Sequence, residues 1–239
     1  VLFVRDGQIH RAPVDPNLTL SRRNNAKTQL FTVFGNNSAP VWSPDGSKIA
    51  FVSQRGDHSL IGIYDVDRRQ VSYLSPNVDF DSNPTFSSDS SQIAFIRRPG
   101  STFGQQVNGG RGGRGAGADN PADGLNRAAF PGGYTLSFWV ADVASGEGRE
   151  FWHSQPGDNS FQPSGFEWAG GNVIFQAEPD NWRHHYSVPI PQSTVEAESI
   201  YGHVYSSSTP SGASTAEPTD LTPGEGIAEF VSVSPDGHY

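Results

Sequence analysis

Short apolar segments recur along the chain at a fixed spacing, and a polar turn precedes each of them. Residues 40–53 read PVWSPDGSKIAFVS and residues 84–97 read PTFSSDSSQIAFIR, so an aromatic residue, a turn and an Ile-Ala-Phe segment return after 44 residues. A looser copy spans 166–177, and another begins at Val231 with VSVSPDGHY. Repetition at a period of a few tens of residues indicates a protein built from similar structural units.

Each repeat predicts a β-hairpin. In the turn Ser43-Pro44-Asp45-Gly46, proline fixes φ at the second position, Asp suits the third, and glycine accepts a positive φ at the fourth. The flanking segments are rich in β-branched and aromatic residues, and further strands are expected near 61–66 and 70–74. Four strands in one repeat are typical of a propeller blade. The predicted fold is therefore all-β, a β-propeller of four-stranded antiparallel blades with about four blade equivalents.

Residues 1–239 are expected to form one propeller domain with two insertions. The insertion at 98–133 contains the Gly-Arg-rich stretch 109–117, and the insertion at 192–218 is rich in Ser, Thr, Pro and Ala, with 194–205 able to pair as an additional hairpin. The expected units are a partial blade at 1–33, blades at 39–75, 83–153 and 164–223, and the first strand of a further blade at 228–234.

The two ends of the chain complement each other in sequence. Residues 234–239 followed by residues 1–4 spell one blade start, in parallel with residues 43–52. Pairing of residues 1–4 with 228–234 would close the ring, and the alternative is a partial propeller with unpaired sheet edges.

The composition excludes several classes of function. The chain has 25 Asp and Glu against 16 Lys and Arg, a net charge of −9, which argues against nucleic-acid binding, including an RNA-binding interpretation of Arg111 and Arg114. It has no cysteine, so disulfides and thiolate chemistry are excluded. No segment is apolar for long enough to span a membrane, and no targeting segment is visible. No cofactor is expected.

The histidines do not show the spacing of a metal site. His153, His184 and His185 are interpreted as strand and loop residues with ordinary hydrogen bonds, and a substrate-facing role for His184 or His185 is the alternative. No catalytic residue and no metal ligand is assigned, and the substrate-binding residues stay unassigned.

A short acidic segment resembles the start of a calcium loop. It consists of Asp79, Asp81 and Asn83, but Pro84 occupies the position where that loop needs a glycine. Asx turns that lead into a strand are therefore the preferred interpretation.

The aromatic residues fall into two classes. Three recur at equivalent repeat positions and are predicted to pack in the core: Trp42, Phe86 and Trp168. Three lie outside the repeat frame and are the better candidates for a ligand-facing surface: Trp152, Phe161 and Trp182.

Several segments resemble known propeller families. The unit Trp-Ser-Pro-Asp-Gly-x-x-Ile-Ala-Phe at 42–51 is similar to repeats of bacterial propellers, including TolB-like proteins. Three others resemble propellers of dipeptidyl-peptidase-like members of the prolyl oligopeptidase family: 139–148, 180–189, and 221–225 followed by 231–237. Their order along the chain carries the resemblance, which covers most of the sequence outside the insertions.

The resemblance implies a propeller that caps an α/β-hydrolase domain, restricts access to its active site and can anchor the substrate N-terminus. This chain lacks the Gly-x-Ser-x-Gly nucleophile motif and the Glu-Glu pair that binds a free amino group in dipeptidyl peptidases.

Two functional hypotheses follow. In the first, the chain is the substrate-gating, non-catalytic propeller of a serine peptidase that acts by acyl transfer. It is inactive alone, and its partners are peptide substrates and a C-terminal α/β-hydrolase domain of the parent chain, in the periplasm or outside the cell. The alternative is a stand-alone TolB-like propeller that binds a protein partner.

Overall fold

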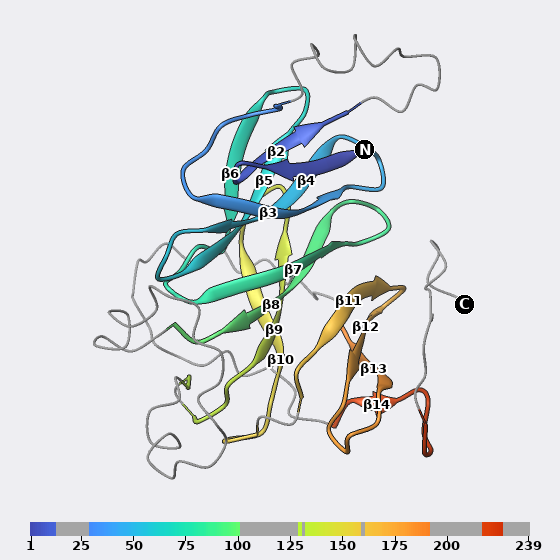
Figure 1. Cartoon of the computed structure of the whole chain (residues 1–239). Coiled ribbons are helices and arrows are strands. Elements are labelled where there is room, and N and C mark those ends of the chain that lie inside the picture. The colour runs from blue at the N-terminus through green and yellow to red at the C-terminus, as the bar shows by residue number, and fades with distance from the viewer. Residues whose placement is uncertain (13–28, 101–128, 131, 159–160, 192–216, 227–239) are drawn as a thin grey trace, which may run out of the picture.

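Strands are the only regular elements in the part of the chain that the structure describes. The computed structural model describes residues 1–12, 29–100, 129–130, 132–158, 161–191 and 217–226, and its strands form antiparallel sheets (Figure 1). The predicted all-β class is therefore confirmed. A membrane-spanning helix is not found among the described residues.

The strands form one hairpin followed by three four-stranded antiparallel units, which we call blades 1 to 4 (Figure 1). Blade 1 contains β1 (Leu2–Arg5) and β2 (Gln8–Arg11). Blade 2 contains β3 (Asn36–Trp42), β4 (Lys48–Gln54), β5 (Ser59–Asp65) and β6 (Gln70–Leu74). Blade 3 contains β7 (Phe80–Phe86), β8 (Gln92–Arg98), β9 (Ser137–Asp142) and β10 (Gly148–His153). Blade 4 contains β11 (Ser164–Ala169), β12 (Asn172–Ala177), β13 (His184–Pro189) and β14 (Thr219–Asp220).

Each of blades 2 to 4 is a meander in which successive strands pair. Blades 2 and 3 are connected by a single parallel residue pair, Ser59 with Phe80. Hydrogen bonds reinforce this junction, because Ser59 N donates to Asp79 O at 3.1 Å and its hydroxyl donates to Asp81 O at 2.7 Å.

The turn between the first two strands of each blade follows its sequence. In blade 2, Gly46 N donates to Ser43 O at 2.9 Å and Gly46 has a φ of 72°. The Ser43 hydroxyl donates to Asp45 Oδ1 at 2.6 Å, and this contact lowers the pKa of Asp45. Blade 3 repeats this geometry with Ser90 at a φ of 64° in place of glycine.

The first strand of every complete blade carries a bulge at the same position. The register shifts between residues 38 and 41, between 82 and 85, and between 164 and 167. The bulged residues Ala39, Asn83 and Gly165 all have a positive φ, between 48° and 56°. Such a bulge bends the strand and increases its twist.

Three apolar clusters hold the blades together. The cluster between blades 1 and 2 consists of Ile9, Ile49, Phe51 and Tyr64. The cluster between blades 2 and 3 consists of Ala50, Val52, Ile61, Ile63, Leu74, Phe86, Ile93, Phe95, Ala141 and Val143. The cluster between blades 3 and 4 consists of Ala94, Ile96, Leu136, Phe138, Val140, Phe151, Trp152, Phe166, Val173, Phe175, Ala177, Tyr186, Val188 and Ile190.

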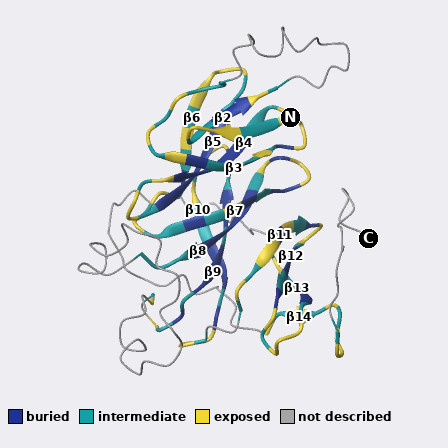
Figure 2. Cartoon of the chain, viewed as in Figure 1, coloured by how far each residue is buried: buried dark blue, intermediate teal, exposed yellow. Residues whose placement is uncertain are grey.

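Alternate residues of one strand therefore serve opposite faces. Ile49 and Phe51 pack toward blade 1, whereas Ala50 and Val52 pack toward blade 3. Figure 2 shows the buried residues concentrated along the middle strands of the blades. Four-stranded meanders that stack face to face in chain order are the arrangement of a β-propeller.

The described sheets do not form a closed ring. Among the described residues, β1 pairs only with β2, and β14 only with β13. The strand expected at 228–234 and its pairing with residues 1–4 lie outside the described residues, as do the stretch 109–117 and the hairpin expected at 194–205.

Candidate functional site

A polar pocket of about 340 Å³ opens at one end of blade 4. It is lined by the beginning of β11, the end of β12 and the loop between β12 and β13, through Gln162, Ser164, Gln176, Ala177, Glu178 and Arg183. Arg183 Nε lies 2.8 Å from Glu178 Oε1, so these two side chains neutralise each other. The pocket thus offers amide and hydroxyl groups without a net charge.

His185 contacts Gln176, one of the residues that line this pocket. Its Nε2 is 3.0 Å from Gln176 Nε2, which assigns Nε2 as the acceptor of an amide N–H. Burial lowers the pKa of His185, although Glu167 acts in the opposite direction, so the ring is neutral at physiological pH. Nδ1 is then the protonated nitrogen, and within the described part of the chain it is buried without a hydrogen-bond partner.

His184 holds the end of the blade together instead of facing a ligand. Its Nδ1 donates to Thr222 O at 2.7 Å, and its ring nitrogens lie 3.4 Å from carboxylate oxygens of Asp180 and Asp220. His184 is 2% exposed. The interpretation of His184 as a residue with ordinary hydrogen bonds agrees with these contacts, and its substrate-facing alternative does not.

The structure confirms the aromatic residues predicted for the core but not all of those expected to face a ligand. Trp42, Phe86 and Trp168 all pack in or against an apolar cluster, as predicted. The ligand-facing interpretation of Trp152 is wrong, because Trp152 is 3% exposed and its ring centroid lies 4.6 Å from that of Phe138.

The other two residues expected to face a ligand, Phe161 and Trp182, have different environments. Phe161 packs edge-on against Tyr186 with 5.1 Å between ring centroids, and therefore supports the core instead of a ligand. Trp182 is 40% exposed in the loop that also carries Arg183, so it is the one of these three aromatic residues that lies open to solvent near the pocket.

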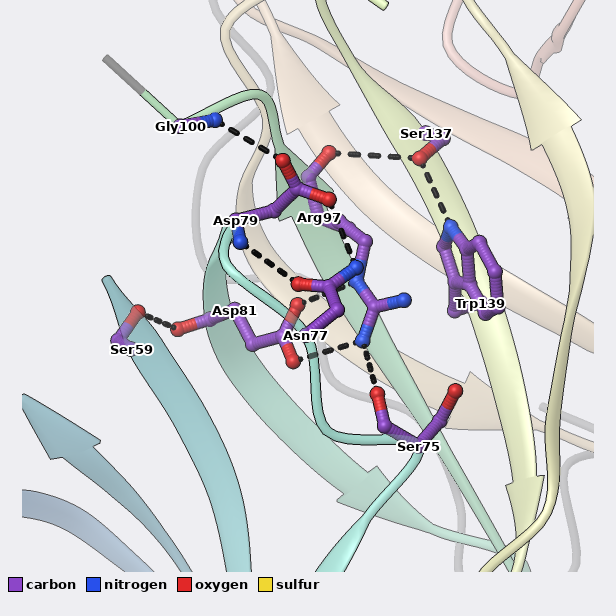
Figure 3. Close-up of polar contacts among 9 residues, drawn as sticks. All are labelled: Ser59, Ser75, Asn77, Asp79, Asp81, Arg97, Gly100, Ser137 and Trp139. Carbon is purple, nitrogen blue, oxygen red and sulfur yellow. Dashed lines mark hydrogen bonds and ion pairs between the residues drawn. The ribbon is translucent and has the colours of Figure 1, made fainter. Parts of the chain in front are cut away.

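A buried ion pair stands at the equivalent end of blade 3. Arg97 on β8 contacts Asp81 on β7 through Nε at 2.7 Å and Nη2 at 2.9 Å, and Nη2 also donates to Ser75 O at 2.7 Å. Figure 3 shows the guanidinium between the carboxylate of Asp81 and the indole of Trp139, whose ring centroid is 4.1 Å from Arg97 Cζ. Because Ser75 follows β6, Arg97 connects blades 2 and 3.

The electrostatics of this pair are dominated by burial. Asp81 is fully buried and Arg97 is 1% exposed. Burial raises the pKa of Asp81 to about 6, although Arg97 acts in the opposite direction. Asp81 is therefore ionised at neutral pH and takes up a proton in mildly acidic solution.

The acidic segment near residue 80 does not gather around a single point. Asp79 N donates to Asn77 Oδ1 at 2.6 Å in an Asx turn, while Asp79 Oδ1 accepts the N–H of Gly100 at 3.0 Å (Figure 3). Asp81 pairs with Arg97, and Asn83 occupies the bulge. Among the described residues, no three His, Asp or Glu side chains converge as metal ligands.

A second buried acid lies on β10. The Tyr134 hydroxyl donates to Glu150 Oε2 at 3.1 Å, and the Tyr134 ring stacks on His153 with 4.2 Å between centroids. Burial raises the pKa of Glu150. Burial also raises the pKa of Tyr134, to about 12. Glu150 Oε1 has no hydrogen-bond partner among the described residues.

A groove of about 550 Å³ lies between blades 2 and 3, at the opposite ends of the strands from Arg97. Its charged lining is mixed, with Lys48, Asp65, Arg68 and Asp142. Arg68 is paired with Asp65 at 3.4 Å and is largely exposed, so solvent screens this pair.

The pocket of blade 4 was not predicted as a site. His184 and His185 are adjacent in the sequence, but neighbouring strand residues point to opposite faces, and only the side chain of His185 reaches Gln176. The signal in the sequence is the repeat itself, because Gln176 occupies the position of Val52 and Ile96 in the other blades.

No protein-family model and no curated protein matches the chain. Its structural neighbours are the β-propeller domains of prolyl oligopeptidase-family peptidases and TolB, all at low sequence identity.

TolB from Acinetobacter baumannii has 14% identity and a TM-score of 0.45, with 71% of this chain and 34% of TolB covered. Dipeptidyl peptidase 4 from Porphyromonas gingivalis has 15% identity and a TM-score of 0.41, with 68% and 25% covered. Acylaminoacyl peptidase from Pyrococcus horikoshii has 15% identity and a TM-score of 0.43, with 78% and 25% covered. The matched regions span between a quarter and about a third of the length of these proteins.

Proposed function

We propose that the chain is the substrate-gating propeller of a serine peptidase of the prolyl oligopeptidase family, whose α/β-hydrolase domain belongs to the parent protein outside these residues. The observation that supports this most is where the family-like segments lie. Residues 139–148 form most of β9 and its turn into β10, and residues 180–189 form the loop before β13 and β13 itself. They occupy the third strand of consecutive blades.

In this proposal the chain supplies selection and the absent domain supplies chemistry. Peptide cleavage would proceed by acyl transfer through a Ser-His-Asp triad, for which this sequence holds no nucleophile motif. Apolar clusters between successive blades make the propeller stiff, so it would admit extended peptides and reject folded proteins. We place the parent protein in the periplasm or outside the cell.

A stand-alone TolB-like binding propeller is the second candidate. The observation that favours it is the mixed-charge groove between blades 2 and 3, which does not depend on any further domain. Such a protein would dock a partner through surface contacts and would show no hydrolytic activity.

A serine-reactive probe separates the two. The parent protein is isolated from its source with an antibody against this segment and treated with a fluorophosphonate that carries a fluorophore. The peptidase proposal predicts covalent labelling, and cleavage of peptides but not of folded proteins. A parent protein that stays unlabelled and leaves peptides intact would contradict the proposal and favour the binding propeller.

A further inference from the structure

The junctions between blades 2 and 3 and between blades 3 and 4 are built in the same way. Each blade directs residues of its second and third strands toward the next blade, and strand register makes these positions equivalent from blade to blade. In blades 2 and 3 they are all apolar and buried: Ala50, Val52, Ile61, Ile63, Ala94, Ile96, Phe138 and Val140. Burial of hydrocarbon therefore holds both junctions together.

The corresponding face of blade 4 is mostly polar. Its equivalent residues, three of them polar, are Ile174, Gln176, His185 and Ser187. This face points away from blade 3, because the alternate residues Val173, Phe175 and Val188 pack in the cluster between blades 3 and 4. In a propeller it is the face on which the next blade stacks, and the sequence predicts the first strand of that blade at 228–234.

The polar side chains of this face are not fully satisfied within blade 4. Gln176 Nε2 lies 3.0 Å from His185 Nε2, and this contact occupies one nitrogen of the imidazole. His185 is 3% exposed, and its Nδ1 is buried without a hydrogen-bond partner among the described residues. A buried N–H needs an acceptor, so we expect the stacked blade to provide one. The junction on this side thus depends on hydrogen bonds instead of an apolar cluster.

A cavity adjoins the same face. Ser164 and Gln176 lie opposite each other in the register of β11 and β12, and both line the pocket of about 340 Å³. At the position equivalent to Gln176, blades 2 and 3 have Val52 and Ile96, which are packed in apolar clusters. The face of blade 4 therefore lacks the close apolar packing of the other two junctions at this end of the strands.

Polar and apolar junctions differ in the free energy that opposes their separation. Separation of an apolar cluster exposes hydrocarbon to water, which is unfavourable in proportion to the exposed area. Separation of a hydrogen-bonded junction is opposed less, because water replaces the lost partners. In a series of stacked units, the interface with the smallest stabilisation opens most often.

We propose that this propeller opens at the junction between blade 4 and the blade that follows it. The apolar clusters keep blades 1 to 4 together, and the next blade separates from the face formed by Gln176, His185 and Ser187. The opening follows from the composition of the blade faces alone. It rests on the proposed function in one respect, because in a gating propeller this opening admits the peptide from the side.

Introduced thiols measure the opening in the full-length natural protein. Ser187→Cys places a thiol on the polar face, and Val140→Cys places one at the equivalent position of the junction between blades 3 and 4. Ser145→Cys is the control for an exposed thiol. Each native protein reacts with N-ethylmaleimide, and peptide mass mapping gives the rate at each site. Ser187→Cys is expected to react roughly tenfold or more faster than Val140→Cys, and more slowly than Ser145→Cys.

A second set of variants tests whether the polar residues cause the opening. Gln176→Ile with His185→Phe installs the residues of blade 3 in the Ser187→Cys protein, and modification of the thiol is expected to slow roughly tenfold. Gln70→Ile is the matched control, because Gln70 is an exposed strand glutamine outside this face, and it should leave the rate unchanged. Urea unfolding establishes that each variant is folded, and Gln176→Ile alone keeps the test valid if the double variant does not fold.

Three results would overturn the inference. The first is an equal rate for Ser187→Cys and Val140→Cys, and the second is a rate for Ser187→Cys equal to that of Ser145→Cys, which would mean that no blade covers this face. The third is a rate that the apolar variants leave unchanged. The outcome is independent of the fluorophosphonate experiment: a labelled protein whose junction stays closed removes only this inference, whereas opening in an unlabelled protein removes only the peptidase assignment.

Discussion

Arg97 and Asp81 show how one blade position is filled in two ways. In blade 2 the equivalent residues are Ser53 and Asn37, and the amide of Asn37 donates to Gly7 O and Gly35 O, both at 3.2 Å. In blade 3 the same place holds a buried ion pair that also reaches Ser75 O of the preceding blade. The buried charge is tolerated because the guanidinium donates two hydrogen bonds to Asp81 and is covered by the indole of Trp139.

Removal of the cation leaves Asp81 buried and alone. Arg97→Met removes the guanidinium, and at neutral pH it is expected to destabilise the chain by about 3–5 kcal/mol, since Asp81 is left buried without its ion-pair partner. Urea unfolding followed by tryptophan fluorescence measures this. Arg68→Met removes an exposed partner of Asp65 and is expected to leave the stability close to that of wild type, because solvent screens this pair. Equal effects of the two variants would contradict the role assigned to Arg97.

The raised pKa of Asp81 predicts a pH dependence with a definite sign. Asp81 has a pKa of about 6 in the fold against 3.8 as its ordinary value, so the folded chain binds this proton more tightly. Its contribution to the free energy of unfolding is therefore complete below about pH 4 and is lost as the pH rises to about 6.

The free energy of unfolding should fall more steeply with rising pH in Arg97→Met, because the cation that opposes protonation of Asp81 is gone. Urea midpoints between about pH 4 and pH 7 test this, with Arg68→Met expected to follow wild type. A midpoint of Arg97→Met that does not fall with rising pH would argue that Asp81 is not the titrating group.

Sequence alone did not reveal the partner of Asp81, although the preferred interpretation of this segment as Asx turns agrees with the turn at Asp79. Asp79, Asp81 and Asn83 stand close together in the chain, but their side chains serve an Asx turn, an ion pair and a bulge, respectively. Pairing of Asp81 with Arg97 depends on the register of β7 and β8. That register includes a bulge that no residue pattern predicts.

At the scale of elements, the bulge of the first strand is the clearest conserved geometry among the blades. Ala39, Asn83 and Gly165 adopt nearly the same left-handed backbone, although only glycine does so without strain. The strand must bend at this place in each blade, so the fold imposes the conformation on alanine.

Exchange of residues at the bulge tests this. Ala39→Gly is expected to stabilise the chain by about 0.5–1 kcal/mol, because relief of the left-handed strain exceeds the added freedom of the unfolded chain. Gly165→Ala should cost about as much, since a Cβ there meets only ordinary contacts with Gln176 and the penalty comes from the backbone. Thermal unfolding of both variants is the measurement. A loss of stability in Ala39→Gly would contradict the assignment of strain.

The strands themselves were predictable, and the reason is local. The Ile-Ala-Phe segments and the turns that begin at Ser43 and Ser87 are determined by residues that lie close together in the sequence. Functional sites were harder to predict, because they depend on which face of the strand each side chain lies on. His184 and His185 look alike in sequence, yet one contacts Thr222 O and the other contacts Gln176 from the opposite face.

At the scale of the whole molecule, the blades are connected in series through separate apolar clusters. Phe138 is central to the cluster between blades 3 and 4, with ring centroids of Trp152, Phe166 and Phe175 within 5.1 Å. Phe51 belongs to the cluster between blades 1 and 2. In such an arrangement, each cluster stabilises chiefly the two blades that it joins.

Truncation of these two residues should loosen different parts of the molecule. Phe138→Ala is expected to cost about 3–5 kcal/mol and to speed amide hydrogen exchange in blade 4 more than in blade 1. Phe51→Ala should show the reverse distribution. Hydrogen exchange read by mass spectrometry resolves the blades, and uniform acceleration in both variants would contradict a serial arrangement.

We propose that this propeller belongs to a larger serine peptidase, and the intact mass of the natural protein tests this proposal most directly. The protein is captured from its source cell with an antibody against this segment and weighed. The account predicts a mass well above the 25.7 kDa of these 239 residues, with room for the remaining blades and a hydrolase domain. A mass near 25.7 kDa would contradict it and leave a propeller that binds but does not cleave.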